Sequence, residues 1–148
     1  MGAKKISAKK FYFGERILPD HVLYPAVMLV DRGLLVVASG ESEIFLRIRL
    51  AQDRMIRAQK LLEKGEESLA LSTLTKSQKY LILAVQEFMS DTEYSHEVGL
   101  ALYTALQENT QNLIDAENNF KVVPTDPIGD LVTESQTLLV SVNNKIRK

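Results

Sequence analysis

Two long apolar patterns, joined at a single glycine between about residues 41 and 89, constrain the fold of this chain more than any other feature. In each pattern, apolar or small residues recur in steps of three and four, the spacing that places side chains on one face of an α-helix. Gly65 between them suits the left-handed residue that ends many helices. So short a connection predicts an antiparallel hairpin of helices at about 41–64 and 66–89, the unit from which bundles are built. The two apolar faces are Ile44, Ile48, Ala51, Met55, Ala58 and Leu62, then Ala70, Leu74, Ser77, Leu81, Ala84 or Val85, and Phe88.

The first of these helices contains pairs of opposite charges that are four residues apart. They are the pairs Glu43–Arg47, Arg49–Asp53 and Asp53–Arg57. Charges at this spacing meet on a helix surface. We therefore expect all three pairs on the outer surface of the helix.

Three further helices are predicted outside the hairpin. One covers about residues 24–38, with Pro25 in the first turn, where its missing N–H has no partner to lose. A second extends to about Phe120, and its start is marked by Ser90 with Glu93 as a capping box, or by Thr92. Its apolar residues are Val98, Leu102, Leu106, Leu113 and Ile114.

The last predicted helix begins at Asp126, a suitable N-cap residue that precedes Pro127. Its apolar residues lie mainly on one side: Ile128, Leu131, Val132, Leu138, Leu139, Val142 and Ile146. The chain therefore predicts an all-α, antiparallel bundle of about five helices. We expect a basic and aromatic N-terminal segment at residues 1–17 and one helical-bundle domain at 18–148.

Composition narrows the function classes. Hydrophobic residues make up 45% of the 148 residues and charged residues 25%, values typical of a globular domain. The net charge of −1 argues against a nucleic-acid-binding protein, which needs clustered Lys and Arg. The absence of cysteine excludes disulfides, thiolate metal sites and a cysteine nucleophile.

No stretch of the sequence reaches the roughly 18 consecutive apolar residues of a membrane span. The four lysines among the first ten residues have no apolar segment behind them, so a signal peptide is not expected here. Two explanations stay open: a cytosolic protein, or a chain that begins after a removed targeting or anchoring segment.

Catalytic and metal-binding patterns are sparse. Glu93 and His96 have the Glu-x-x-His spacing of di-iron bundles, but such sites need two of these motifs and further glutamates. We treat Glu93 and His96 as weak metal candidates, with a capping glutamate and a surface histidine as the preferred interpretation. The sequence has no nucleophile elbow and no glycine-rich phosphate loop. We therefore expect no enzyme activity, no catalytic residues and no cofactor.

The N-terminal region carries the candidate contact residues. Phe11, Tyr12 and Phe13 lie beside Lys4, Lys5, Lys9 and Lys10, which could also contact an anionic membrane surface. The helix expected at 24–38 is apolar nearly all round, so it is either central in the bundle or part of an interface. The predicted partner-binding residues are Phe11, Tyr12, Phe13, Val30 and Leu34.

Residues 18–88 resemble a family of bacterial, extracytoplasmic helical domains of unknown function. The resemblance lies in an "LPxxxLYPxK" motif, followed after a break by a helix that ends in "LLEKG". Leu18, Pro19, Asp20, Leu23, Tyr24 and Pro25 match the first part, and Leu50, Ala51, Arg54, Ala58, Leu61, Leu62, Glu63, Lys64 and Gly65 match the second. Val22 replaces a frequent proline, and Val27 replaces a usually basic residue. The resemblance implies a location outside the cytoplasm, often with a membrane anchor, and it supplies no catalytic residues.

Together these observations predict a non-catalytic, envelope-associated interaction or sensory module that binds a protein partner or itself. Two alternatives stay open. One is a cytosolic bundle that binds a metal or a small ligand, and the other is a structural subunit of a larger assembly.

Overall fold

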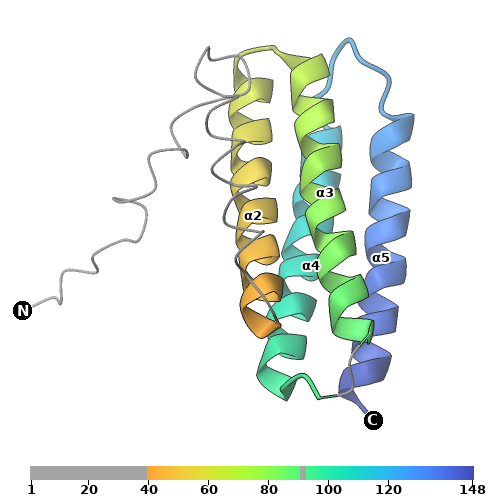
Figure 1. Ribbon diagram of the computed structural model, residues 1–148. Coiled ribbons are helices and arrows are strands. Elements are labelled where there is room, and N and C mark those ends of the chain that lie inside the picture. Colours follow the sequence, from red (N-terminus) through yellow and green to blue (C-terminus); the bar gives the residue numbers. More distant parts are fainter. Residues whose placement is uncertain (1–39, 91–92) are drawn as a thin grey trace, which may run out of the picture.

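The computed structural model describes residues 40–90 and 93–148, and this part of the chain forms four α-helices. They are α2 (Glu41–Glu63), α3 (Glu67–Ser90), α4 (His96–Glu117) and α5 (Asp126–Ile146). The helices run alternately up and down along the bundle axis (Figure 1). The predicted all-α bundle and the long hairpin are confirmed. The structure describes four helices where about five were predicted, because the helix expected at residues 24–38 lies outside the described residues.

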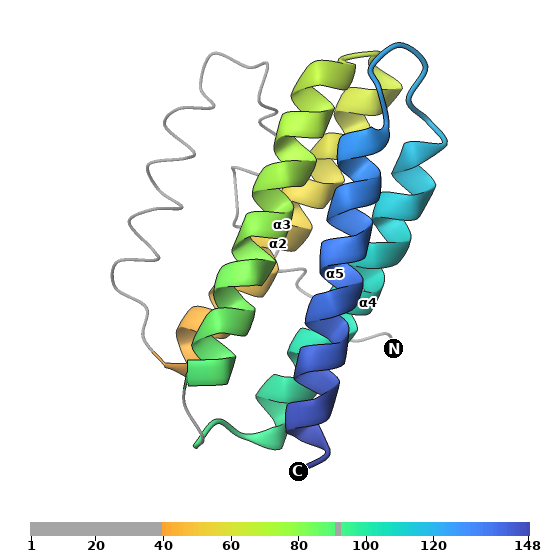
Figure 2. The ribbon, with the colours of Figure 1, turned by 90° about the vertical axis from the view of Figure 1, so that its right-hand side faces the viewer.

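The bundle consists of two antiparallel hairpins laid side by side. α2 packs on α3 and α4 packs on α5, while α2 also contacts α4, and α3 also contacts α5. The two views in Figures 1 and 2 show that these inter-hairpin neighbours run in the same direction. The α2–α4 side of the bundle, which carries the candidate site, is therefore built from two parallel helices.

The turn between α2 and α3 forms as predicted. Gly65 adopts a positive φ of 77°. Its N–H donates to Leu62 O at 3.0 Å, and the N–H of Glu66 donates to Leu61 O at 2.9 Å. These two bonds form a Schellman motif, which satisfies carbonyl groups left free at the end of α2.

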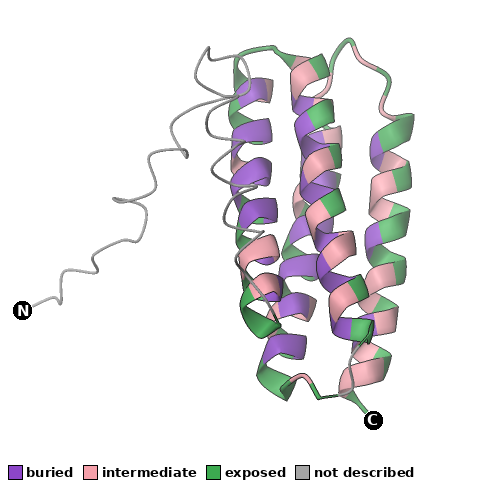
Figure 3. Cartoon of the chain, in the orientation of Figure 1, coloured by how far each residue is buried: buried purple, intermediate pink, exposed green. Residues whose placement is uncertain are grey.

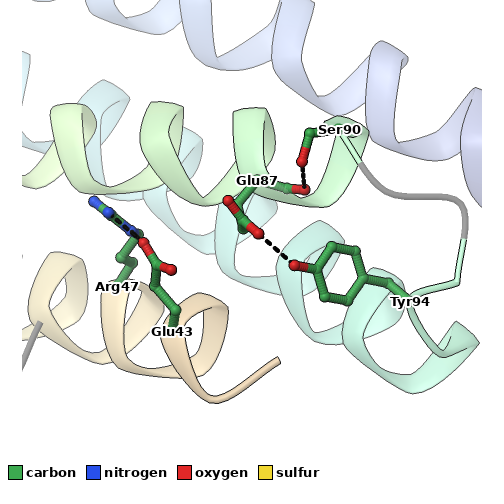
Figure 4. Close-up of polar contacts among 5 residues, drawn as sticks. All are labelled: Glu43, Arg47, Glu87, Ser90 and Tyr94. Carbon is green, nitrogen blue, oxygen red and sulfur yellow. Dashed lines mark hydrogen bonds and ion pairs between the residues drawn. The ribbon is translucent and has the colours of Figure 1, made fainter. Parts of the chain in front are cut away.

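The start of α4 differs from the prediction. The helix begins at His96, and its N-cap is Ser95, whose side chain accepts a hydrogen bond from the N–H of Val98. Ser90 instead remains in α3, where its hydroxyl donates to Glu87 O at 2.7 Å (Figure 4). Serine caps a helix only where the backbone leaves the helical region, and that happens at Ser95, whose ψ is 152°. The end of α4 at Glu117 also precedes the predicted end at Phe120.

The N-cap of α5 is shifted by one residue from the predicted one. Asp126 is the first residue of the helix and Thr125 is the N-cap, so Asp126 contributes a negative charge to the first turn. A negative charge there is favourable because the helix dipole is positive at this end.

Buried residues occur along the whole length of the bundle (Figure 3). Besides a small cluster of Leu61 and Ala70, two main apolar clusters of described residues fill it. The larger one lies around Ile48, Leu81, Leu102 and Val142, and the smaller one around Met55, Leu74, Leu113 and Ile128. The predicted apolar faces of α2 and α3 are buried, except that Leu62 is only partly buried. In α4, Ile114 is an exception, with an exposed fraction of 37%.

The charged residues of α2 are only partly where the sequence placed them. Arg47 and Glu43 form the predicted pair at 2.5 Å (Figure 4). Asp53 and Arg57, however, have exposed fractions of 6% and 0%, so the prediction that they lie on the outer surface is wrong. A spacing of four residues aligns two side chains but does not reveal what else packs against that side of the helix.

Glutamates at the starts of α2 and α3 fix the loops at the two ends of the bundle. Glu41 accepts a hydrogen bond from the N–H of Ser95 at 2.9 Å. Glu67 accepts three, from the N–H groups of Lys121, Val122 and Val123, at 2.7, 2.9 and 2.7 Å. These backbone donors, led by Val123, lower the pKa of the Glu67 carboxyl below its usual value. Glu67 thus ties the α4–α5 loop to the first turn of α3.

Candidate functional site

A layer of buried polar side chains crosses the bundle between the two apolar clusters. Ser77 and Gln78 from α3, Asn109 and Thr110 from α4, and Ser135 from α5 are each at most 8% exposed. Buried polar groups must be hydrogen-bonded to avoid a large desolvation penalty. The pairing of these groups therefore decides whether the layer is structural or leaves capacity for a ligand.

One half of the layer is fully paired. Thr110 Oγ1 donates to Leu106 O within α4 at 2.8 Å. Since its single proton is used there, the 2.7 Å contact with Ser135 Oγ has Ser135 as the donor. This bond joins α4 to α5 at the middle of the bundle.

The other half of the layer links all four described helices. Asn109 Nδ2 donates to Gln78 Oε1 at 2.7 Å. Gln78 Nε2 reaches Glu134 Oε2 of α5 at 3.5 Å. Ser77 Oγ donates to Ala51 O of α2 at 2.7 Å. The polar layer thus contacts all four described helices.

Asn109 retains hydrogen-bonding capacity at its side-chain oxygen. Ser77 Oγ lies 3.5 Å from Asn109 Oδ1, but the one hydroxyl proton of Ser77 is committed to the much shorter contact with Ala51 O. Asn109 is only 5% exposed. An Oδ1 atom that receives no hydrogen bond in such a buried position costs free energy. The buried amide is therefore prepared to accept a hydrogen bond.

A half-open cleft of about 540 Å³ lies between α2 and α4 at the level of this layer. This volume falls within the range of small-ligand and recognition pockets. Its apolar lining consists of Ala51, Met55, Ile56, Leu81 and Ala105. Its polar lining consists of Arg49, Gln52, Asp53, Gln59, Glu108, Asn109 and Asn112. Asn109 is thus the residue that lines the cleft and also donates to Gln78 inside the bundle.

Carboxamides dominate the polar chemistry of the cleft. Gln52 and Gln59 come from α2, and Asn109 and Asn112 from α4. A carboxamide both donates and accepts hydrogen bonds, as a peptide group does. The described lining contains no histidine and no hydroxyl side chain, and its carboxamides can bind and position a ligand.

The site residues predicted from the sequence do not form this cleft. Phe11, Tyr12, Phe13, Val30, Leu34 and the N-terminal lysines lie outside the described residues. Glu93 and His96 are both exposed, and they do not share a helix, because Glu93 precedes the N-cap of α4. Within residues 40–90 and 93–148, no three His, Asp or Glu side chains are grouped so that they could hold a metal ion.

Gaps in two apolar patterns of the sequence correspond to the polar layer, and they were not among the features used to predict a site. The apolar pattern of α4 jumps from Leu106 to Leu113, and that of α5 jumps from Val132 to Leu138. Asn109, Thr110 and Ser135 occupy the missing core positions. Interrupted apolar patterns at matching levels of two helices therefore predict a buried polar contact between them.

Comparison with protein families assigns the chain. Residues 16–126 match the profile of a family described as Domain of unknown function (DUF5667). This match covers well over half of the chain. The chain belongs to the DUF5667 family. The family match includes the regions of α2, α3 and α4, and it extends beyond the residues 18–88 on which the sequence resemblance rested.

No curated protein and no solved structure matched the chain in the corresponding searches. Membership of DUF5667 agrees with the helical domain of unknown function that the sequence resemblance predicted. Among the helices of the described residues, none combines the length and the apolar character needed to cross a membrane.

Proposed function

We propose that this DUF5667 chain is a non-catalytic interaction module of the cell envelope, and that it binds a protein partner in the α2–α4 cleft. The observation that carries the proposal is the cleft itself, in which carboxamides on both walls surround apolar side chains. Such a lining provides apolar contact area together with a few positioned polar groups, the usual composition of a recognition site.

The shape of the bundle supports a binding role. The cleft lies between two parallel helices of a bundle whose loops are tied down by Glu41 and Glu67. A rigid frame keeps the lining residues in place before the partner arrives, which reduces the ordering entropy lost on binding. The envelope location rests on the family resemblance of the "LPxxxLYP" segment.

Site-specific photocrosslinking tests the proposed site. A photoreactive amino acid replaces Gln59, which is exposed and lines the cleft, in cells that naturally express the protein. The matched control places the same amino acid at Gln136, an exposed glutamine of α5 that is not part of the cleft lining. We expect one protein to crosslink at Gln59 and not at Gln136, and to copurify with the envelope fraction.

Equal crosslinking from both positions, or none from Gln59, would contradict the cleft as the partner site. A specific crosslink to a cytosolic protein would retain the site and remove the envelope location. The captured protein must then bind the purified full chain directly before it counts as support.

A further inference from the structure

The chemistry of the cleft points to a particular kind of occupant. We propose that it binds an extended polypeptide segment through the segment's backbone, with Asn109 Oδ1 accepting a hydrogen bond from one peptide N–H. This inference rests on the proposed function and specifies the part of the partner that the cleft recognises. Its test is chosen so that the two proposals can fail separately.

The carboxamides of the cleft match peptide groups in their hydrogen bonding. A peptide backbone presents N–H donors and C=O acceptors in alternation, and Gln52, Gln59 and Asn112 can each satisfy either. The formal charges of the described lining residues Arg49, Asp53 and Glu108 sum to −1, which does not favour a strongly anionic ligand. This lining therefore suits uncharged backbone groups better than it suits a phosphate or a carboxylate.

The length of the cleft suits a short extended segment. Arg49 and Gln59 delimit the cleft along α2, and ten residues of α-helix rise about 15 Å. An extended chain covers this distance in about four to five residues at roughly 3.3 Å each. A segment of that size therefore fits along the α2–α4 cleft.

Asn109 lacks a donor that a peptide can supply. Its Nδ2 is engaged by Gln78 at 2.7 Å, and its Oδ1 has only the 3.5 Å contact with Ser77, whose proton points to Ala51 O. This 5%-exposed side chain therefore keeps acceptor capacity at Oδ1, besides the second N–H of its Nδ2. A peptide N–H provides the missing proton, whereas an apolar group in its place would leave the oxygen buried and unsatisfied.

The experiment uses a random peptide display library selected on the full chain. Peptides are retained only if Gln59→Ala weakens their binding and Gln136→Ala does not. Each retained peptide is then resynthesised with single backbone N-methyl groups, one position at a time, because N-methylation removes one N–H donor. Affinities are measured by calorimetry for the natural chain and for Asn109→Leu, and the same substitution at the exposed Asn118 serves as the matched control.

We expect one N-methyl position to weaken binding to the natural chain and to Asn118→Leu about tenfold, the ratio that corresponds to 1.4 kcal/mol. In Asn109→Leu the same methyl group should have little effect, because the acceptor is already gone. Asn109→Asp keeps an acceptor oxygen, so it should retain the N-methyl sensitivity, and it provides the comparison if Asn109→Leu does not fold.

An N-methyl effect in Asn109→Leu that equals the effect in the natural chain would overturn the assignment of Asn109, and so would loss of the effect in Asn109→Asp. If no selected peptide depends on the cleft while the crosslinked partner does, the extended-segment proposal fails and the proposed function stands. If neither depends on the cleft, both fail.

Discussion

α2 and α5 are both long amphipathic helices, yet they are buried in very different ways. Ten residues of α2 are buried, among them Arg54 and Arg57 at 0% exposure, whereas three residues of α5 are. Those three, Ile128, Ser135 and Val142, are spaced seven apart and form a single narrow line along the helix.

The difference shows what each helix contributes. α2 is anchored over much of its circumference, and Arg54 places its guanidinium 5.8 Å from the centre of the Tyr80 ring. α5 closes the bundle through one line of contacts whose middle member is a serine. A helix anchored broadly makes a firm wall for a binding cleft, whereas one held along a narrow line opens at a smaller free-energy cost.

The largest expected effect compares one substitution in both helices. Ile44→Ala in α2 and Ile128→Ala in α5 each remove a side chain with 0% exposure, and such changes cost about 2–5 kcal/mol of unfolding free energy. We expect Ile44→Ala at the upper end of this range and Ile128→Ala at the lower end, because α5 can move inward to fill the space. Urea unfolding measures both. The opposite order would contradict the difference in anchoring.

A smaller effect is expected from glycine substitutions in α4 and α5. A Cβ atom at Gly99 would lie 2.9 Å from Ile146 Cγ1 and 2.9 Å from Phe88 Cζ, whereas one at Gly129 meets nothing within 4 Å. Overpacking costs about 1–3 kcal/mol, and alanine gains up to about 1 kcal/mol of helix propensity over glycine. Gly99→Ala should therefore lower the unfolding free energy by about 1 kcal/mol, while Gly129→Ala should raise it by about 0.5–1 kcal/mol. Thermal and urea unfolding decide the sign, and stabilisation by Gly99→Ala would show that α5 is not tightly packed there.

A substitution at Ser135, in the middle of the line of buried α5 residues, should have an effect of similar size. Ser135→Ala removes the hydrogen bond to Thr110, and the Thr110 hydroxyl keeps its bond to Leu106 O. The expected loss of unfolding free energy is about 0.5–1.5 kcal/mol, the net value of one hydrogen bond. Ser141→Ala is the control, since that hydroxyl donates to Thr137 O within α5, and it should change stability by less than about 0.5 kcal/mol. Equal effects of the two substitutions, measured by urea unfolding, would show that the α4–α5 bond does not stabilise the bundle.

The smallest effect concerns the loop that leads into α5. The pKa of Glu67 is lowered in the folded chain by backbone hydrogen bonds, so its carboxylate stabilises the fold above its unfolded pKa. This stabilisation is lost as the pH falls through the lowered, folded pKa. Glu67→Gln should therefore be less stable than the natural chain at about pH 7, and this difference in unfolding free energy should shrink as the pH falls. Urea unfolding between about pH 3 and pH 7 measures it. Glu66→Gln, at the exposed neighbouring residue, is measured alongside as the control. A Glu67→Gln profile parallel to that of the natural chain would contradict the role of these bonds.

The helices of the described residues follow from local sequence patterns, and their packing does so only in part. The Gly65 turn and the apolar faces of α2 and α3 are predictable because they depend on spacing and on one backbone conformation. The start of α4 was predicted wrongly because both Ser90 and Ser95 are of a residue type that caps helices, and the sequence does not show which one has the extended backbone that a cap needs.

The candidate cleft could not be predicted from the sequence for a related reason. Its walls come from α2 and α4, which are separated in the chain by the whole of α3 and pack side by side only in the folded bundle. In the sequence, Asn109 and Gln78 cannot be told from other polar residues of their helices. Only the folded bundle brings them together, in a 2.7 Å hydrogen bond. The family match likewise names no activity that would have pointed to them.

The central claim is that the partner binds along α2 and α4 rather than α5. The direct test is the affinity of the crosslinked partner for the purified natural chain, for Gln59→Ala and for Gln136→Ala, measured by isothermal titration calorimetry. Binding in the cleft predicts a weaker affinity for Gln59→Ala and an unchanged affinity for Gln136→Ala. Unchanged binding to Gln59→Ala, together with weaker binding to Gln136→Ala, would contradict it.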